Sequence, residues 1–240
     1  MKKIVYILGI ICAMTMQSCL DLEPKTQLAD TNYWKSPEHF KLFATQFYGW
    51  SADFRWLDDS QHADIRSDLF AGSTVNIYSN GTNSIPSSDK HYTDNYNRIR
   101  QVNTLLQQAD AYEQQADIAI SVGEARFFRA YCYFNLVRAF GEVPLVTYKI
   151  NDASEANIPK TTADKIYEQI DTDLKTAEES LPETWSTEYT GRLTWGAARS
   201  LHARTYMMRN DWNNMYTAST DVIKKGLYNL KTPYNEIFTD

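Results

Sequence analysis

Residues 126–140 constrain the fold of this chain more than any other segment, because apolar side chains lie on every face of the helix that they predict. Eleven of these fifteen residues are apolar or aromatic, and they do not form a single stripe. A helix that is apolar all round is buried in the centre of a protein. Gly141 and Pro144 then stop the helix, since glycine ends helices readily and proline cannot continue one. The sequence therefore predicts a central buried helix over residues 117–140.

Three arginines inside this segment, Arg126, Arg129 and Arg138, exclude a membrane span. We expect them to pair with acids of neighbouring helices, because a buried charge without a partner is strongly unfavourable. Cys132 lies in the same segment. A packed structural thiol explains that cysteine better than a catalytic nucleophile does.

Several other segments combine helical spacing with residues that begin or end helices. Ser36-Pro37-Glu38 is a typical helix start, and aromatic residues continue at helical spacing up to Gly49. Nine glycines and seven prolines in 240 residues leave few turns, which favours long helices. Further helices are predicted over residues 94–112, from Thr162 to Leu181-Pro182, from Thr194 to Asn210-Asp211, and from Trp212 to Lys225 before Gly226.

These helices predict an all-α fold. Helix pairs of this length, with alanines where the helices cross, resemble tetratricopeptide repeats, although residues 142–161 interrupt any strict period. We therefore expect a tetratricopeptide-like helical-repeat domain over residues 36–240, with a long loop-rich insertion over residues 51–91. Four tryptophans on or beside the helices are expected in its core: Trp34, Trp50, Trp195 and Trp212.

The first residues form a targeting signal. Lys2 and Lys3 precede an apolar run over residues 4–14, which is shorter than the roughly 20 residues that span a bilayer and is typical of a signal peptide. Ser18-Cys19 resembles the lipobox of bacterial lipoproteins. We interpret residues 1–18 as a lipoprotein signal peptide, Cys19 as the acylated (palmitate-bearing) residue, and residues 19–35 as an extended segment. An ordinary secretory signal followed by a coincidental cysteine is the alternative.

Composition and motifs argue against several functions. The 30 acidic residues outnumber the 24 basic ones, and a net charge of −6 makes nucleic acid an unfavourable partner. The four histidines are scattered without the spacing of zinc ligands, and no nucleophile elbow or phosphate-binding glycine loop occurs. We therefore expect no enzyme activity, no metal and no cofactor.

The loop-rich residues 51–91 contain the side chains that sugar binding requires. Aromatic rings stack on the apolar faces of sugars, and planar amides, acids and arginines bond their hydroxyl groups. Capped turns, and aromatics that anchor the loop on the helices, are the alternative interpretation. Trp185 and Tyr189, in a polar turn, are weaker candidates. The ligand-binding candidates of the loop are Trp56, Asp64, Arg66, Asp68, Asn76, Tyr78 and Asn80.

Two segments together resemble one known family. Residues 123–146 (GEARFFRAYCYFNLVRAFGEVPLV) closely resemble the signature of the SusD/RagB family, and residues 191–207, with Gly191-Arg192 before an alanine-rich helix, are similar to another of its segments. The resemblance implies a surface-exposed outer-membrane lipoprotein of Bacteroidota, with a mostly helical fold that contains tetratricopeptide-like units. It also implies a partner, a SusC-type TonB-dependent transporter, and a ligand that is a glycan or, in some members, a peptide.

The expected function is therefore non-catalytic capture of an oligosaccharide and its delivery to the transporter. A peptide-binding member of the family is one alternative. A scaffold that docks on the transporter, with no ligand site of its own, is the other. Because members of the family are considerably longer, the resemblance also implies that residues 36–240 are the N-terminal part of a longer protein.

Overall fold

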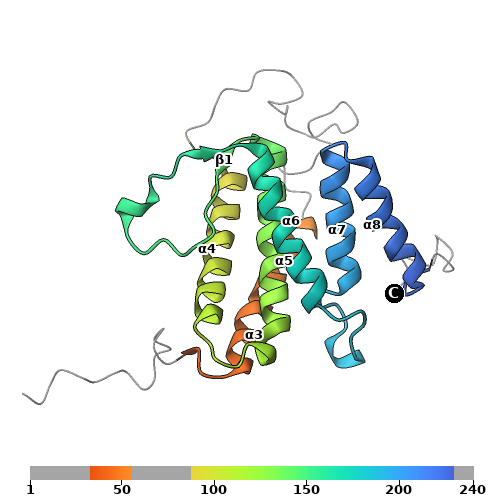
Figure 1. Ribbon diagram of the computed structural model, residues 1–240. Helices are drawn as coiled ribbons and strands as arrows, with labels where there is room; N and C mark the ends of the chain where they lie inside the picture. Colours follow the sequence, from red (N-terminus) through yellow and green to blue (C-terminus); the bar gives the residue numbers. More distant parts are fainter. Residues whose placement is uncertain (1–32, 56–87, 230–240) are drawn as a thin grey trace, which may run out of the picture. The chain divides into compact units, whose positions relative to one another are not determined.

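The structure, a computed structural model, describes residues 33–55 and 88–229 (Figure 1). The chain divides into two units, Met1–His39 and Phe40–Asp240. In the first unit, the ring of Tyr33 stacks on that of His39 with 5.0 Å between centroids, and the Tyr33 hydroxyl donates to the His39 carbonyl oxygen at 3.3 Å. These contacts fix the turn at which the first described helix begins.

Helix α3 (Pro37–Thr45) begins where Ser36-Pro37 predicts. It does not continue to Gly49 as expected, but changes at Gln46 into a 3₁₀ helix, η2 (Gln46–Arg55). Glycine and aromatic residues are weaker helix formers than alanine or leucine, and residues 47–50 consist of these types alone. A change to tighter winding at this point therefore has a local cause.

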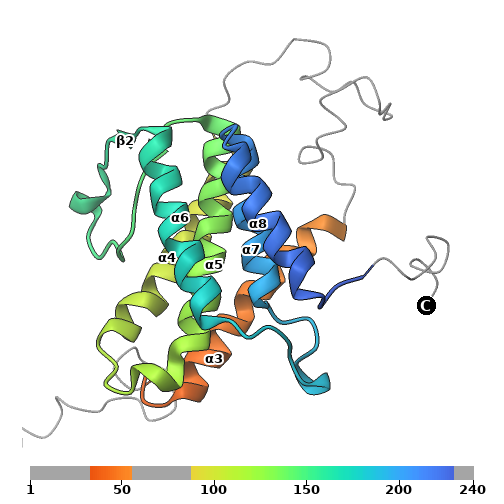
Figure 2. The ribbon, with the colours of Figure 1, turned by 45° about the vertical axis from the view of Figure 1, so that its right-hand side comes forward.

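The second unit is built from packed helices: α4 (Lys90–Asp110), α5 (Gln115–Phe140), α6 (Ala163–Ser180), α7 (Trp195–Met208) and α8 (Trp212–Lys225). Each helix packs against the next one in the chain, and α5 also contacts α7. Figures 1 and 2 show α4, α5 and α6 side by side, followed by the α7–α8 pair. Neighbour-on-neighbour packing is characteristic of helical-repeat proteins, and the all-α, tetratricopeptide-like prediction is confirmed.

A short two-stranded sheet closes the connection between α5 and α6. Strand β1 (Val143–Pro144) pairs antiparallel with β2 (Lys160–Thr161), so that Val143 lies opposite Thr161 and Pro144 opposite Lys160. Between the strands, the chain makes an excursion that includes the 3₁₀ turn η4 (Ala153–Ala156). The excursion corresponds to the segment that interrupts the repeat in the sequence.

The main core lies around α5. Tyr133, Phe134 and Leu136 of that helix are buried among Ile99 of α4 and aliphatic side chains of α6 such as Ile170. The prediction of a central helix buried on several faces is therefore confirmed.

Gly123 lets α5 and α6 approach closely, because a Cβ atom at this position would lie 2.7 Å from Cβ of Ser180. Any larger residue would force the two helices apart. The glycine therefore belongs to the packing of the central helix.

Helix ends follow the predicted signals closely. The Thr194 hydroxyl accepts the Ala197 N–H at 3.3 Å at the start of α7, and Gly226 ends α8 in the left-handed conformation with φ 68°. Helix α4 begins four residues before the expected position, because Asp89 caps it by accepting the Tyr92 N–H at 3.0 Å.

Gly191-Arg192, in the segment before α7, is linked to α5 and, through the same carboxylate of α5, to η2. With φ at 94°, Gly191 takes a backbone conformation that favours glycine, and Arg192 then reaches Glu124 of α5. Arg192 Nε and Nη2 donate to Glu124 Oε1 at 2.9 Å and Oε2 at 2.5 Å. The Tyr48 hydroxyl of η2 donates to Oε1 of the same carboxylate at 2.6 Å. Burial, followed by the Glu124 charge, raises the pKa of Tyr48, so its hydroxyl stays a donor.

Two expectations from the sequence, one about Trp212 and one about Arg138, are wrong. Trp212 was expected in the core but is 55% exposed. Helix α8 packs on α7 through Ala218. Trp212 lies six residues before Ala218, about 240° around the helix from it, and therefore faces away from α7. Arg138 was expected to pair with an acid of a neighbouring helix. It is exposed near the end of α5, and among the described residues its guanidinium instead lies 5.6 Å from the centre of the Phe134 ring. Trp34 is buried as expected, whereas Trp50 and Trp195 are half-buried.

Among the described helices, none combines the length and the apolarity that a membrane crossing requires.

Candidate functional site

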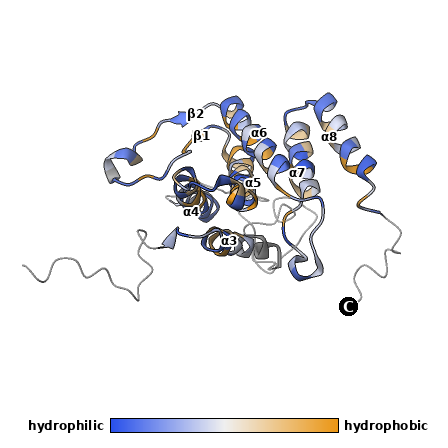
Figure 3. Ribbon diagram, turned by 60° about the horizontal axis from the view of Figure 1, so that its bottom comes forward, coloured by the Kyte–Doolittle hydropathy of each residue, from blue (hydrophilic) through white to orange (hydrophobic). Residues whose placement is uncertain are grey.

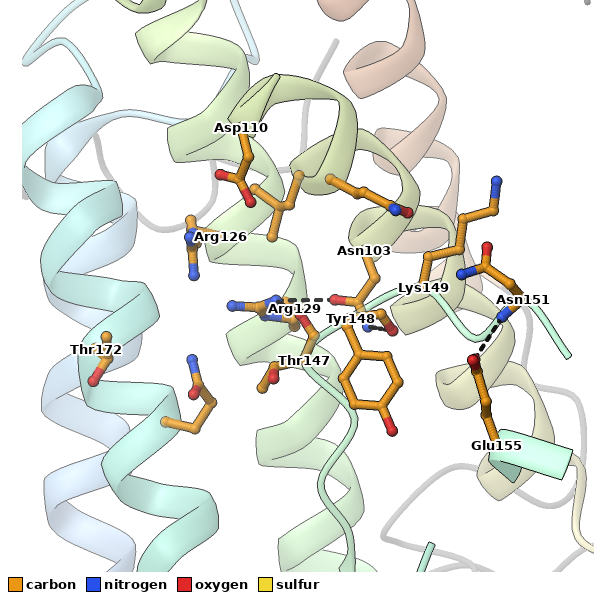
Figure 4. A pocket seen from close by; sticks show the side chains of 13 residues that line it. Asn103, Asp110, Arg126, Arg129, Thr147, Tyr148, Lys149, Asn151, Glu155 and Thr172 are labelled. Carbon is orange, nitrogen blue, oxygen red and sulfur yellow. Dashed lines mark hydrogen bonds between the residues drawn. The ribbon is translucent and has the colours of Figure 1, made fainter. Parts of the chain in front are cut away.

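A pocket of about 510 Å³ opens between α4, α5, α6 and the excursion that follows β1 (Figure 4). Its volume falls within the range of small-ligand sites. Figure 4 shows Arg126 and Arg129 on α5, Thr172 on α6, and Tyr148 and Asn151 on the excursion. The lining residues are Asn103, Leu106, Gln107, Asp110, Arg126, Arg129, Thr147, Tyr148, Lys149, Asn151, Glu155, Gln169 and Thr172.

Arg129 lines the pocket and is paired with the buried Asp173 of α6. Arg129 donates through Nε and Nη2 to Oδ2 and Oδ1 of Asp173 at 2.8 and 2.7 Å, and through Nη1 to Asn103 Oδ1 at 2.9 Å. Arg126 Nη1 donates to Oδ1 of the same carboxylate at 3.0 Å. The predicted pairing of these two arginines with an acid of a neighbouring helix is confirmed. Because two guanidinium groups share one carboxylate, this cluster carries a net positive charge.

The same buried side chains hold the backbone of the excursion. The Asn103 amide donates to the carbonyl oxygens of Val146 at 3.0 Å and Tyr148 at 2.9 Å, and Arg129 Nη1 donates to that of Thr147 at 3.1 Å. The Tyr133 hydroxyl donates to the Val146 carbonyl oxygen at 2.9 Å and accepts the Val146 N–H at 2.7 Å. Residues 146–148 are therefore fixed on the helices through their main chain.

Charges of both signs lie around the opening. Asp110 and Glu155 contribute carboxylates, while Arg126 and Lys149 contribute cations. Glu155 also accepts the Asn151 N–H at 3.0 Å. Such a lining donates and accepts hydrogen bonds in many directions, which suits a ligand rich in hydroxyl groups better than an apolar molecule or a strong anion.

Cys132 is separate from this pocket. It is completely buried in α5, and burial raises the pKa of its thiol to about 12. A thiol with such a pKa stays protonated at neutral pH and is a poor nucleophile. The interpretation of Cys132 as a packed thiol therefore agrees with the structure.

The ligand residues predicted from the sequence cannot be compared with the pocket, which is formed by described residues. All seven of them, from Trp56 to Asn80, and the lipidation residue Cys19 lie outside the described residues. The weaker candidates Trp185 and Tyr189 hold their own turn together. Trp185 Nε1 donates to the Leu193 carbonyl oxygen at 2.8 Å, and its ring lies 5.7 Å from that of Tyr189.

Sequence reasoning missed most of the pocket. It gave Arg126 and Arg129 a structural role and gave Tyr148 none. The available signal was the insertion over residues 142–161, since segments inserted into helical repeats often form a functional face. Which side chains of that insertion meet the helices depends on packing.

Comparison with known proteins agrees with this fold. A protein-family profile described as "Starch-binding associating with outer membrane" (SusD-like) matches residues 19–207. The chain belongs to the SusD-like family. A SusD-like protein of Formosa agariphila is 26% identical over 230 residues, which cover 90% of this chain and 44% of the relative. The chain thus spans less than half the length of that curated relative.

Solved structures of SusD-like proteins have the same fold. One from Bacteroides fragilis superposes with a TM-score of 0.67 at 25% identity, covering 84% of this chain and 40% of that protein. A laminarin-binding SusD-like protein superposes with a TM-score of 0.65 at 22% identity, covering 77% of this chain and 43% of that protein. Carbohydrate binding therefore occurs within the family.

Proposed function

We propose that this SusD-like protein captures an oligosaccharide at the outer membrane and passes it to a SusC-type transporter, without catalysing a reaction. The observation that carries the proposal is the match of residues 19–207 to a family described as starch-binding and associated with the outer membrane. The polar pocket beside α5 supports it, because its lining suits a ligand rich in hydroxyl groups. In this proposal, acylated Cys19 anchors the protein in the membrane.

A docking scaffold is a second candidate, favoured by the surface of α8. Trp212, Tyr216 and Ile223 are 55%, 70% and 77% exposed, and their spacing of four and seven residues places them on one face of the helix. The hydrophobic segment near the C-terminal end of α8 is orange in Figure 3. Exposed apolar side chains gathered on one face are typical of a protein contact.

Calorimetric titration and co-purification with the transporter separate these functions. The protein is titrated with maltoheptaose, laminarihexaose and a mixture of oligopeptides, and a SusC-type transporter of the same organism is tested for co-purification. Binding of a glucan together with co-purification supports the proposed function. Binding of peptides alone indicates the peptide-binding alternative. Co-purification without binding of any ligand indicates the scaffold, and loss of co-purification in Tyr216→Ala assigns the contact to α8.

A further inference from the structure

Tyr148 has an unusual combination of a fixed backbone and an exposed ring. Its side chain lies at the pocket and is half exposed, with 50% of the residue accessible. Its carbonyl oxygen is held by the buried amide of Asn103, and the two preceding carbonyl oxygens are held by Asn103, Arg129 and Tyr133. The ring takes no part in these bonds. We therefore expect the backbone of residue 148 to keep its position when the tyrosine side chain is replaced.

A rigidly presented aromatic ring suits recognition. Ordering a loop on binding weakens affinity, whereas a segment already fixed by buried hydrogen bonds avoids that loss. Tyrosine offers a large flat face with only two rotatable bonds, so little side-chain entropy is lost when a ligand covers it. The exposed ring of Tyr148 therefore has the properties of a platform for a flat, partly apolar ligand surface.

Polar groups from three helices line the same pocket. Arg126 donates through Nη1 to Asp173, and its side chain remains 26% exposed. Gln107 comes from α4 and Gln169 from α6, so both amides can donate and accept around one ligand. Tyr148 supplies an exposed aromatic ring, whereas Leu106, the other apolar residue of the lining, is almost completely buried. The lining holds three cations (Arg126, Arg129 and Lys149) and two carboxylates (Asp110 and Glu155). Because Arg129 is already paired with Asp173, these charges nearly balance, which suits a neutral ligand.

We propose that this pocket is a subsite for one ring of a neutral oligosaccharide. The sugar ring stacks on Tyr148, while its hydroxyl groups bond with Arg126, Gln107 and Gln169. Figure 4 labels Tyr148 and Arg126 among the residues that line this pocket. The proposal rests on the proposed glycan-capture function, and it adds a location and a charge class for the ligand. The described residues that line the subsite belong to the helical-repeat part of the chain and to the excursion between β1 and β2.

The test is calorimetric titration of the full chain with maltoheptaose and laminarihexaose. We expect Tyr148→Ala to weaken binding of the preferred glucan about tenfold, which corresponds to the loss of one aromatic stacking contact. Tyr148→Phe keeps the stacking face, and its Kd should stay within about twofold of the parent. Tyr228→Ala is the matched control, because Tyr228 is 52% exposed, much like Tyr148, and does not line the pocket, so it should leave Kd unchanged. Tyr148→Leu, which keeps bulk without an aromatic face, is the second variant if circular dichroism shows that Tyr148→Ala is misfolded.

Failure of the subsite and failure of the proposed function give different results. If Trp56→Ala weakens glucan binding and neither Tyr148→Ala nor Tyr148→Leu does, the subsite is overturned and glycan capture stands. If the parent protein binds no glucan, both proposals are overturned. Tighter binding of tetragalacturonate than of either neutral glucan overturns the assignment to a neutral sugar.

Discussion

Arg129 and Asp173 form a two-point ion pair between α5 and α6, with only 2% and 0% of their side chains exposed. Because Arg129 also holds Asn103 and the Thr147 carbonyl oxygen, this pair links the two central helices to the excursion that carries Tyr148. The fold and the pocket therefore depend on the same buried charge, and most of the following predictions concern such buried groups.

Asp173→Ala should lower the free energy of unfolding by about 3–5 kcal/mol, because Arg129 would remain buried without its partner. Urea unfolding followed by circular dichroism measures the change. Asp94→Ala is the control, since Asp94 pairs with the exposed Lys90 on the surface of α4. It should change stability by no more than about 0.5 kcal/mol. Equal losses of unfolding free energy in the two variants would show that the buried pair stabilises the fold no more than the surface pair does.

Phe134→Ala should lower the free energy of unfolding by about 3–5 kcal/mol, because it leaves a cavity in the centre of the core. Thermal melting reports the loss. Phe140→Ala, at the partly exposed end of the same helix, should cost clearly less. A Phe134→Ala protein that melts like the parent would contradict the central position of α5.

His202 should make stability depend on pH. Burial alone lowers its pKa, but the nearby carboxylates of Asp171 and Glu178 on α6 outweigh burial, so the pKa of His202 is raised. Its Nδ1 lies 2.7 Å from Glu178 Oε1 and its Nε2 lies 3.3 Å from Asp171 Oδ1, the latter without hydrogen-bond alignment. The protonated imidazole therefore stabilises the folded state.

The sign of this effect follows from the raised pKa. Stabilisation by His202 is complete below the unfolded-state pKa of about 6.5 and is lost as pH rises through the higher folded-state pKa. Urea unfolding at several pH values should show the parent losing stability on the alkaline side of about pH 6.5, and His202→Gln losing less. A stability difference between the two proteins that stays constant with pH would contradict the prediction.

Cys132 should resist thiol reagents in the folded protein. Burial raises the pKa of its thiol to about 12, so little thiolate forms at neutral pH and no reagent reaches it. In a leaderless form with Cys19→Ser, Cys132 is the only cysteine. We expect a dithiobis-nitrobenzoate reagent to label it in urea and to leave it unlabelled under native conditions. Rapid native labelling would show that α5 opens readily.

Cys19→Ala should release the protein from the membrane fraction, because it removes the residue that the lipobox-like sequence provides for acylation. Fractionation and the intact mass of the processed protein are the measurements. Ser18→Ala keeps a small residue before the cysteine and should leave fractionation unchanged. Unchanged mass and fractionation of Cys19→Ala would contradict lipidation.

Local sequence determined the helices of this protein. Thr194 and Gly226 act within one turn of the helix that they begin or end, so their effect is encoded by a few neighbouring residues. The burial of α5 was also evident, because apolar side chains on every face leave a helix no stable position at the surface. The glycan-binding residues expected in the loop remain predictions.

Tertiary structure alone decided the pocket. Asn103, Arg126, Tyr148 and Gln169 come from three helices and one excursion, and no pattern within any single segment relates them. Trp212 shows the same limit, since its aromatic character suggested burial while the side of α8 that packs on α7 left it exposed. Helix signals act over one turn, whereas a site depends on which faces meet when distant helices pack, and that is decided by the sum of many weak contacts across the fold.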